Sequence, residues 1–322
     1  MRIVMFGTGP FAVPTFQSLL DSNHEVVALF TRPIADAGKR RKTAENPTRD
    51  VAESIGLPIF DPVNVNDDES VQQLESFQSD LFVVCDYGQI LSRDCLAAAR
   101  LGGINLHGSL LPKYRGAAPI HWAIYHGEPT TGITIIHMTA KLDGGPCLVA
   151  VETEIQPDET TETIEPRLAQ LGVEPVNQAI QMLEAWDGSS EIGIRQDQAL
   201  ATKAPRLKKS DGLIDWNRSA TQIVNQIRAF QPWPGTYSNW HAPNKKQPVR
   251  LIIHQAAVAN TDDLDARDTQ PGHVLSVDKN RLVIATGDGG LELLIIQPAG
   301  KKPMPIADFL RGNPPQVDDR FA

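Results

Sequence analysis

Short apolar runs alternate with helix-compatible segments through the first 150 residues, and this alternation constrains the fold more than any other feature. The strand-like runs are Ile3–Phe6, Val26–Phe30, Leu81–Val84, Gly103–Leu106 and Gly132–His137. The helix-like segments between them include Phe11–Leu20, Thr48–Ile55 and Ser70–Phe77. Because parallel strands need helical crossovers, the alternation predicts a doubly wound, Rossmann-like, mostly parallel α/β sheet. Ligands of such sheets bind at the carboxyl ends of the strands.

A change of pattern after residue 187 predicts a second domain. One more helical stretch runs from Glu159 to about Trp186, and a polar, mixed segment follows it. After a predicted helix at Ser219–Phe230 come short β-type runs separated by turn signals, at 249–253, 273–277, 281–286 and 291–296. We therefore predict a catalytic domain at 1–187, a linker at 188–208, and a smaller C-terminal β-barrel of the OB-like type at 209–322.

Composition excludes several classes of protein. No stretch approaches eighteen consecutive apolar residues, so we expect no membrane span, and the apolar run at the N-terminus is too short for a signal peptide. The three cysteines are scattered, which predicts free thiols in a cytoplasmic protein rather than disulfides or a metal site. The net charge of −9 argues against general binding of nucleic acid.

Basic residues are nevertheless concentrated in one place. Between residues 32 and 49 lie six basic side chains and two acidic ones; the basic ones are Arg32, Lys39, Arg40, Arg41, Lys42 and Arg49. One basic segment in an acidic chain predicts a local contact with an anionic partner.

Asn105 and His107 are the strongest candidates for chemistry. They are two residues apart on a predicted strand, so both side chains lie on one face, and the strand ends at Gly108. Asp143 follows the predicted strand Gly132–His137 in a glycine-rich loop. If both strands ran the same way, Asp143 would lie at the same edge of the sheet as His107. A buried polar pair and an ordinary turn aspartate are the structural alternatives.

A competing motif lies at the first turn. Gly7-Thr8-Gly9-Pro10-Phe11-Ala12 matches the G-x-G-x-x-A dinucleotide fingerprint, and Arg32 after the second strand would suit the phosphate of NADP. However, Pro10 removes a backbone donor where phosphate binding needs donors. A dinucleotide enzyme is therefore the less favoured interpretation.

The segment from Asn105 to Ile120 resembles the signature of the folate-dependent formyltransferases, which use 10-formyltetrahydrofolate. The resemblance implies that Asn105, His107 and Asp143 are catalytic. It assigns the folate contacts to Ser109, Leu110, Leu111 and Pro112. The segment Asp86, Tyr87, Gly88, Gln89 and Ile90 resembles the loop that walls the pterin pocket. No metal is implied.

Other segments resemble the branch of this family that acts on charged tRNA. They are 211–216, 227–235 and 297–304, together with the basic segment 32–49. This likeness implies transfer of the formyl group to the methionine amino group of initiator methionyl-tRNA by a monomeric enzyme. It assigns tRNA contacts to Arg32, Lys39, Arg40, Arg41, Lys42, Lys208, Lys209, Lys301 and Lys302. Two alternatives stay open: an enzyme of the same family that acts on a sugar nucleotide or other small amine, and a non-catalytic RNA-binding protein.

Two departures from the family pattern are visible. The first turn reads Gly7-Thr8-Gly9-Pro10, whereas the family usually has Gly-Thr-Pro followed by an acid. The loop after Asp143 reads Gly144-Gly145-Pro146, where Thr-Gly-Asp is usual. The expected mechanism passes through a tetrahedral intermediate. Asn105 would donate to its oxyanion, His107 would donate as imidazolium, and Asp143 would take the amine proton.

Overall fold

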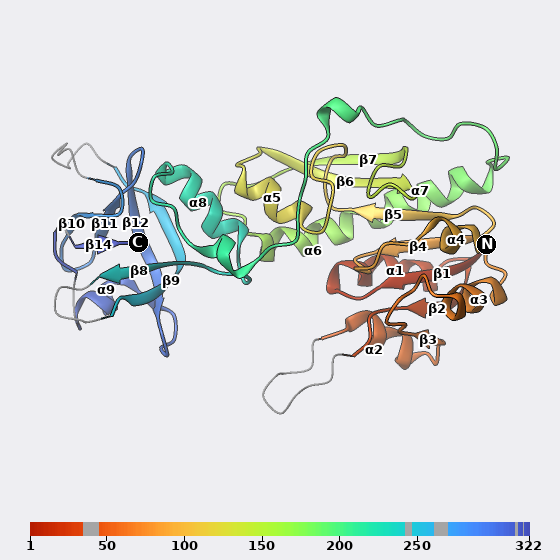
Figure 1. The fold of residues 1–322 in the computed structure, drawn as a ribbon, viewed down its shortest axis with the longest axis horizontal. Coiled ribbons are helices and arrows are strands. Elements are labelled where there is room, and N and C mark those ends of the chain that lie inside the picture. The colour runs from red at the N-terminus through yellow and green to blue at the C-terminus, as the bar shows by residue number, and fades with distance from the viewer. Residues whose placement is uncertain (35–44, 242–246, 261–269, 313–314, 318) are drawn as a thin grey trace. The chain divides into compact units, whose positions relative to one another are not determined.

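The structure is a computed structural model that describes residues 1–34, 45–241, 247–260, 270–312, 315–317 and 319–322. The chain forms two compact units (Figure 1). The first comprises Met1–Pro119, Thr130–Glu154 and Thr163–Pro205, and the second comprises Ile120–Pro129, Ile155–Glu162 and Arg206–Ala322. The segment predicted as a linker, 188–208, is mostly irregular, and its residues as far as Pro205 belong to the first unit.

A seven-stranded sheet in the order β3-β2-β1-β4-β5-β6-β7 forms the centre of the first unit. Its strands are β1 (Arg2–Gly7), β2 (Glu25–Phe30), β3 (Ile59–Phe60), β4 (Leu81–Cys85), β5 (Gly103–His107), β6 (Thr130–His137) and β7 (Cys147–Glu154). The five strands from β3 to β5 pair in parallel, so the prediction of a mostly parallel α/β sheet is confirmed.

The expectation that Gly132–His137 is another parallel strand was wrong. β6 pairs antiparallel with β5, and β7 pairs antiparallel with β6. A parallel strand would need a crossover that returns over the sheet. The segment between β5 and β6 contains α5 (Pro119–Tyr125), and its residues Ile120–Pro129 belong to the second unit. The chain therefore re-enters the sheet beside the carboxyl end of β5, and β6 runs in the opposite direction to β5.

Helices cover both faces of the parallel strands. They are η1 (Pro10–Ala12), α1 (Val13–Leu20), α2 (Pro47–Ser54), α3 (Asp68–Ser76), α4 (Arg93–Ala97), α6 (Thr161–Leu171) and α7 (Val173–Glu184). The short η2 (Gln198–Leu200) lies in the irregular segment that follows α7. Leu74 of α3 and Leu96 of α4 pack in one cluster with Phe6 and Phe82, which lie on one face of the sheet. Helix α1 contacts α2 and α7, and these three form the other layer.

The predicted helical stretch from Glu159 to Trp186 is two helices, because the chain turns at Gly172 between α6 and α7. A Cβ atom at Gly172 would lie 2.4 Å from Cδ1 of Leu106 on β5. Glycine therefore allows this junction to lie directly against the strand that carries Asn105 and His107.

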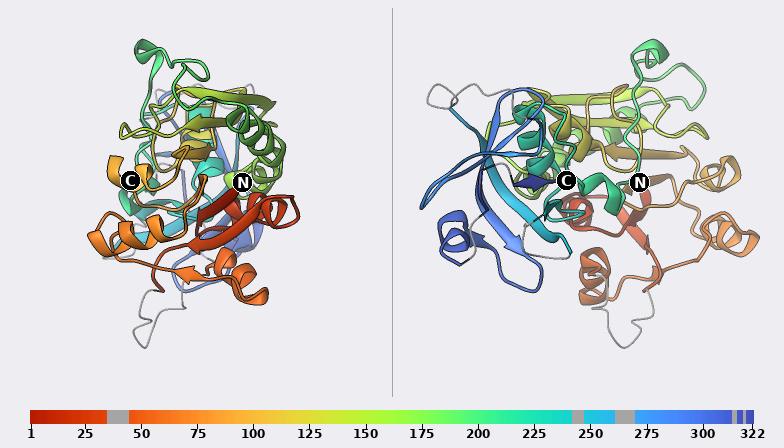
Figure 2. Two further views of the ribbon diagram at one scale, coloured as in Figure 1. Left: turned by 90° about the vertical axis from the view of Figure 1, so that its right-hand side faces the viewer. Right: turned by 60° about the vertical axis from the view of Figure 1, so that its left-hand side comes forward.

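The second unit is a small β structure, as predicted for a C-terminal barrel. Its strands are β8 (Thr236–His241), β9 (Val249–Val258), β10 (Val274–Val277), β11 (Leu282–Ala285), β12 (Gly290–Pro298), β13 (Met304–Pro305) and β14 (Arg320–Phe321), with η3 (Lys209–Gly212), α8 (Ala220–Ala229) and α9 (Ile306–Leu310). The sheet order is β10-β11-β12-β9-β8-β14, and an antiparallel bridge between His273 and Arg320 joins its two edges. The sheet therefore curls into a near-closed barrel, whose long strands are drawn in blue in Figure 2.

Candidate active site

Strand β5 presents the two polar side chains that the sequence singled out. It lies between β4 and β6, and the pleat places Asn105 and His107 on the same face. The His107 side chain is buried, whereas Asn105 keeps part of its surface open. Nε2 of His107 lies 2.9 Å from the backbone carbonyl oxygen of Tyr114. Because a carbonyl only accepts, Nε2 is the protonated donor, and Nδ1 is the ring nitrogen that faces Asp143.

Asp143 reaches His107 from an unexpected direction. His137, the last residue of β6, pairs with Ile104 near the start of β5. The loop 138–146 therefore begins at the end of the strands that lies away from His107. This loop nevertheless brings Oδ2 of Asp143 to 3.8 Å from Nδ1 of His107. The Asp143 side chain is 11% exposed. Because both side chains are largely buried, a charge on one is screened from the other less than it would be at the surface.

A later part of the same signature holds both groups. The backbone N–H of Gly116 donates to Oδ2 of Asp143 at 2.8 Å, and the carbonyl of Tyr114 accepts from His107. Gly116 has φ of +129°, and a Cβ atom there would lie 2.4 Å from the carbonyl oxygen of Ala204. Only glycine fits this turn. The run Arg115-Gly116-Ala117-Ala118-Pro119 carried that signal in the sequence, but we did not assign Tyr114 or Gly116 a role.

The predicted folate segment 109–112 is a tight turn beside β6. Ser109 is fully buried, and its hydroxyl donates to the Lys113 carbonyl at 2.8 Å. Thr134 of β6 donates to the Ser109 carbonyl and accepts from the Leu111 N–H. The Ser109 side chain therefore shapes the turn from inside, while Leu110, Leu111 and Pro112 keep part of their surface open. Nothing in the sequence pattern pointed to Thr134.

The predicted pterin loop, 86–90, has an inner and an outer side. The Tyr87 ring is 1% exposed and packs edge-on against Phe6, so it belongs to the core. The amide of Gln89 bonds to the Val65 N–H and the Pro62 carbonyl. Ile90 is 60% exposed.

Two carboxyl groups near the ends of β1 and β4 have perturbed ionisation. Asp86 keeps solvent-accessible surface, but protein atoms surround its carboxyl group, and this desolvation raises its pKa. The Arg32 guanidinium and the N–H of Gly9 partly offset that effect by favouring the charged form. Desolvation also raises the pKa of Glu165 on α6, and the negative charge of Asp86 raises it further. The charge of Asp86 therefore disfavours the ionised form of Glu165.

The first turn of the chain does not resemble a phosphate site. The N–H of Gly9 donates to the Asp86 carboxylate, although a dinucleotide would need such donors for its pyrophosphate. A carboxylate at this point also repels phosphate. The geometry therefore disfavours the dinucleotide interpretation.

The proposed tRNA-contacting residues fall into three groups. Arg32 donates to the carbonyl oxygens of Tyr87 and Gly88, which ties its guanidinium to the pterin loop. The four predicted lysines of the second unit, Lys208, Lys209, Lys301 and Lys302, are exposed. The cluster Lys39, Arg40, Arg41 and Lys42 lies outside the described residues.

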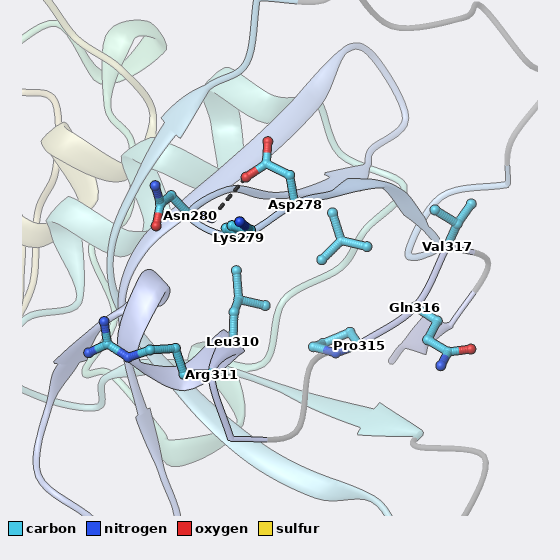
Figure 3. Close-up of a pocket in the computed structure, with 9 residues that line it drawn as sticks. Asp278, Lys279, Asn280, Leu310, Arg311, Pro315, Gln316 and Val317 are labelled. Atoms are coloured by element: carbon cyan, nitrogen blue, oxygen red, sulfur yellow. Dashed lines mark hydrogen bonds between the residues drawn. The ribbon is translucent and has the colours of Figure 1, made fainter.

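Outside these segments, we find one further hollow of interest. It has a volume of about 740 Å³ and lies in the second unit. Figure 3 shows its lining side chains, which include Asp278, Lys279, Leu310 and Arg311. Within the described ranges, no cluster of three or more His, Cys, Asp or Glu side chains could hold a metal ion. No helix among those same residues is long and apolar enough to cross a membrane.

The fold and this site agree with the family that the sequence signature indicated. The pattern of the family described as "Formyl transferase" matches residues 1–180, and that of "Formyl transferase, C-terminal domain" matches residues 206–314. The chain belongs to the formyl transferase family, whose members use folate.

Two bacterial proteins of similar sequence carry the name methionyl-tRNA formyltransferase. Methionyl-tRNA formyltransferase of Rhodopirellula baltica is 42% identical over 320 residues, which cover 97% of this chain and 94% of that protein. The enzyme of the same name from Geobacter sulfurreducens is 37% identical over 312 residues, with the same coverage.

Solved structures support the fold. The sugar 3N-formyl transferase WlaRD, crystallised with dTDP and 5-N-formyl-THF, superposes with a TM-score of 0.64 at 18% identity over 94% of this chain and 99% of its own. HypX from Aquifex aeolicus, in complex with tetrahydrofolic acid, gives a TM-score of 0.60 at 17% identity, covering 99% of this chain and 50% of HypX.

Proposed function

We propose that this protein is a methionyl-tRNA formyltransferase, which transfers the formyl group of 10-formyltetrahydrofolate to the methionine amino group of initiator methionyl-tRNA. The observation that carries the proposal is the pairing of His107 with Asp143 at 3.8 Å, beside Asn105, in a chain 42% identical to an enzyme of that name. A non-catalytic RNA-binding protein would have no need of this arrangement. We further propose that the enzyme acts as a monomer in the cytoplasm.

The geometry divides the chemical work between the side chains. Attack of the amine on the formyl carbon creates a tetrahedral intermediate with a negatively charged oxygen. Nε2–H of His107 is engaged by the Tyr114 carbonyl, and Nδ1 faces Asp143, so the amide of Asn105 is the donor left for the oxyanion. The His107–Asp143 pair would accept the proton that the attacking amine loses. It would return this proton to N10 of the folate as the bond between the formyl carbon and N10 breaks, which releases tetrahydrofolate and the formylated amine.

Folate would bind along the carboxyl ends of β4 and β5. The contacts come from Leu110, Leu111, Pro112 and the loop 86–90, while Ser109 supports them from below. The tRNA would be held by the basic cluster Lys39–Lys42, with Arg32 and the lysines of the second unit, Lys208, Lys209, Lys301 and Lys302, as further phosphate contacts.

The test is a transfer assay with purified protein and 10-formyltetrahydrofolate. Three acceptors are compared: methionyl-tRNA, an amino sugar linked to a nucleotide, and a free small amine. We expect formylated methionyl-tRNA and tetrahydrofolate in equal amounts. Transfer to the amino sugar alone would support the sugar-nucleotide alternative, and the absence of any transfer would support the non-catalytic one.

A further inference from the structure

We infer that Gln196, in the segment that follows α7, is a positioning residue for Asp143. The inference rests on the proposed formyl transfer, because it concerns the geometry of the group that handles the amine proton. Gln196 lies 53 residues beyond Asp143 in the chain, and no motif in the sequence marks it.

The side-chain amide of Gln196 is fully engaged on both sides. Its Nε2 donates to the backbone carbonyl of Asp143 at 2.8 Å and to that of Gly145 at 2.7 Å. Its Oε1 accepts from Arg115, with Nε at 3.0 Å and Nη2 at 2.6 Å. Carbonyls only accept and guanidinium only donates, so the amide fits in one orientation alone.

These hydrogen bonds form a closed network that includes Asp143. Gln196 holds the backbone of Asp143 to the Arg115 side chain, and Gly116, the next residue, donates its N–H to the Asp143 carboxylate. Arg115 is itself fixed, because its N–H donates to the Thr202 carbonyl and its carbonyl accepts from the Ala204 N–H. Backbone and carboxylate of Asp143 are therefore anchored to the same short segment, and through it to the 196–204 stretch.

The Asp143 loop needs such an anchor. Asp143 has φ of +45°, and it is followed by two glycines, which restrict the backbone least of all residues. Without Gln196, the loop would lose the two hydrogen bonds that fix the carbonyls on either side of Gly144. A displacement of about 1 Å at a catalytic group can reduce the rate about 100-fold. We therefore expect loss of Gln196 to lower kcat and to leave the KM for folate nearly unchanged.

Three variants separate positioning from other roles. Gln196→Ala removes both halves of the contact. Gln196→Glu keeps the size and the pairing with Arg115 but replaces the donor to the two carbonyls by an acceptor. The matched control is Gln198→Ala. Gln198 is exposed, lies on the same segment and accepts from Nη1 of the same Arg115 at 2.9 Å and from the Lys141 ammonium, but it donates to the Gln196 carbonyl and not to the backbone carbonyls of the Asp143 loop.

The experiment measures kcat and the KM for folate and for methionyl-tRNA, together with the melting temperature of each variant. We expect kcat to fall about 10- to 100-fold in Gln196→Ala and at least as far in Gln196→Glu, and to stay within about twofold in Gln198→Ala. Near-normal kcat in Gln196→Ala, or recovery in Gln196→Glu, would overturn the inference, since Glu restores volume and the arginine contact but not the donor. If Gln196→Ala fails to fold, the isosteric Glu variant decides alone. Failure of the wild-type enzyme to formylate any acceptor would instead refute the proposed function.

Discussion

Oδ2 of Asp143 lies 3.8 Å from Nδ1 of His107, although β6, the strand before Asp143, ends beside the start of the strand that carries His107. The contact depends on the loop 138–146 folding back toward the far end of β5. Such a loop has no strand partner at that point to hold it. Its position instead depends on the N–H of Gly116 and the amide of Gln196.

Replacing Asp143 or His107 should stop the chemistry without unfolding the protein. Asp143→Asn keeps an oxygen that can accept from Gly116 but removes the charge opposite His107, and His107→Ala removes the imidazole. We expect single-turnover formylation to slow about 100- to 10,000-fold in each, the usual contribution of a positioned acid or base. tRNA affinity and melting temperature should change little. Wild-type rates in either variant would contradict the catalytic assignment.

At pH values above the usual range of carboxyl titration, Glu165→Gln should stabilise the protein. Because burial and Asp86 raise the pKa of Glu165, the folded state binds its proton more tightly than the unfolded state. Stability is therefore lost as pH rises from the ordinary value of 4.5 through the raised value. Glutamine carries no such penalty, so the melting temperature at pH 7.5 should rise by about 1–3 °C and at pH 4 should hardly change.

Glu162→Gln is the matched control for this comparison. Glu162 lies on the same helix but is exposed. Its replacement should leave the melting temperature at both pH values nearly unchanged. An equal rise in the two variants would show that the effect comes from the net charge of the protein rather than from the environment of Glu165.

His121 should weaken the second unit in mild acid. Burial lowers the pKa of His121 to about 4, so between pH 6.5 and 4 the unfolded chain binds a proton that the folded protein does not. Stability is thus lost as pH falls through this range. Between pH 7 and pH 4.5, the wild type should lose about 2 kcal/mol more of its unfolding free energy than His121→Gln does. Urea titrations followed by tryptophan fluorescence measure this difference, and parallel losses in both proteins would argue against a buried, neutral His121.

The basic cluster should contribute most of the salt dependence of tRNA binding. If Lys39, Arg40, Arg41 and Lys42 all contact phosphates, their replacement by Ala should reduce the slope of log affinity against log salt by about three to four. Folate affinity should not change. An unchanged slope would mean that the cluster is only a solvated surface, and that phosphate contacts come from Arg32 and the lysines of the second unit.

Local sequence patterns were sufficient to predict a large part of the fold. The alternation of strand-like and helix-like segments predicted the parallel strands β1, β2, β4 and β5 but not the two-residue β3, since periodicities of 2 and 3.6 residues are visible only in segments longer than that. The same period placed Asn105 and His107 on one face. The signature around them indicated the family.

Tertiary structure alone decided the direction of β6 and the support of the site. Strand direction depends on where the connecting chain runs, and Ile120–Pro129 belong to another unit instead of crossing the sheet. The hydrogen-bond partners of Asp143 could not be predicted either. Gln196 is 53 residues away in the sequence, and a hydrogen bond between residues so far apart in the chain produces no periodic pattern. The sequence determined which residues are present as candidates for the chemistry, namely Asn105, His107 and Asp143; long-range packing of the 196–204 segment against Arg115 decided how Asp143 is held.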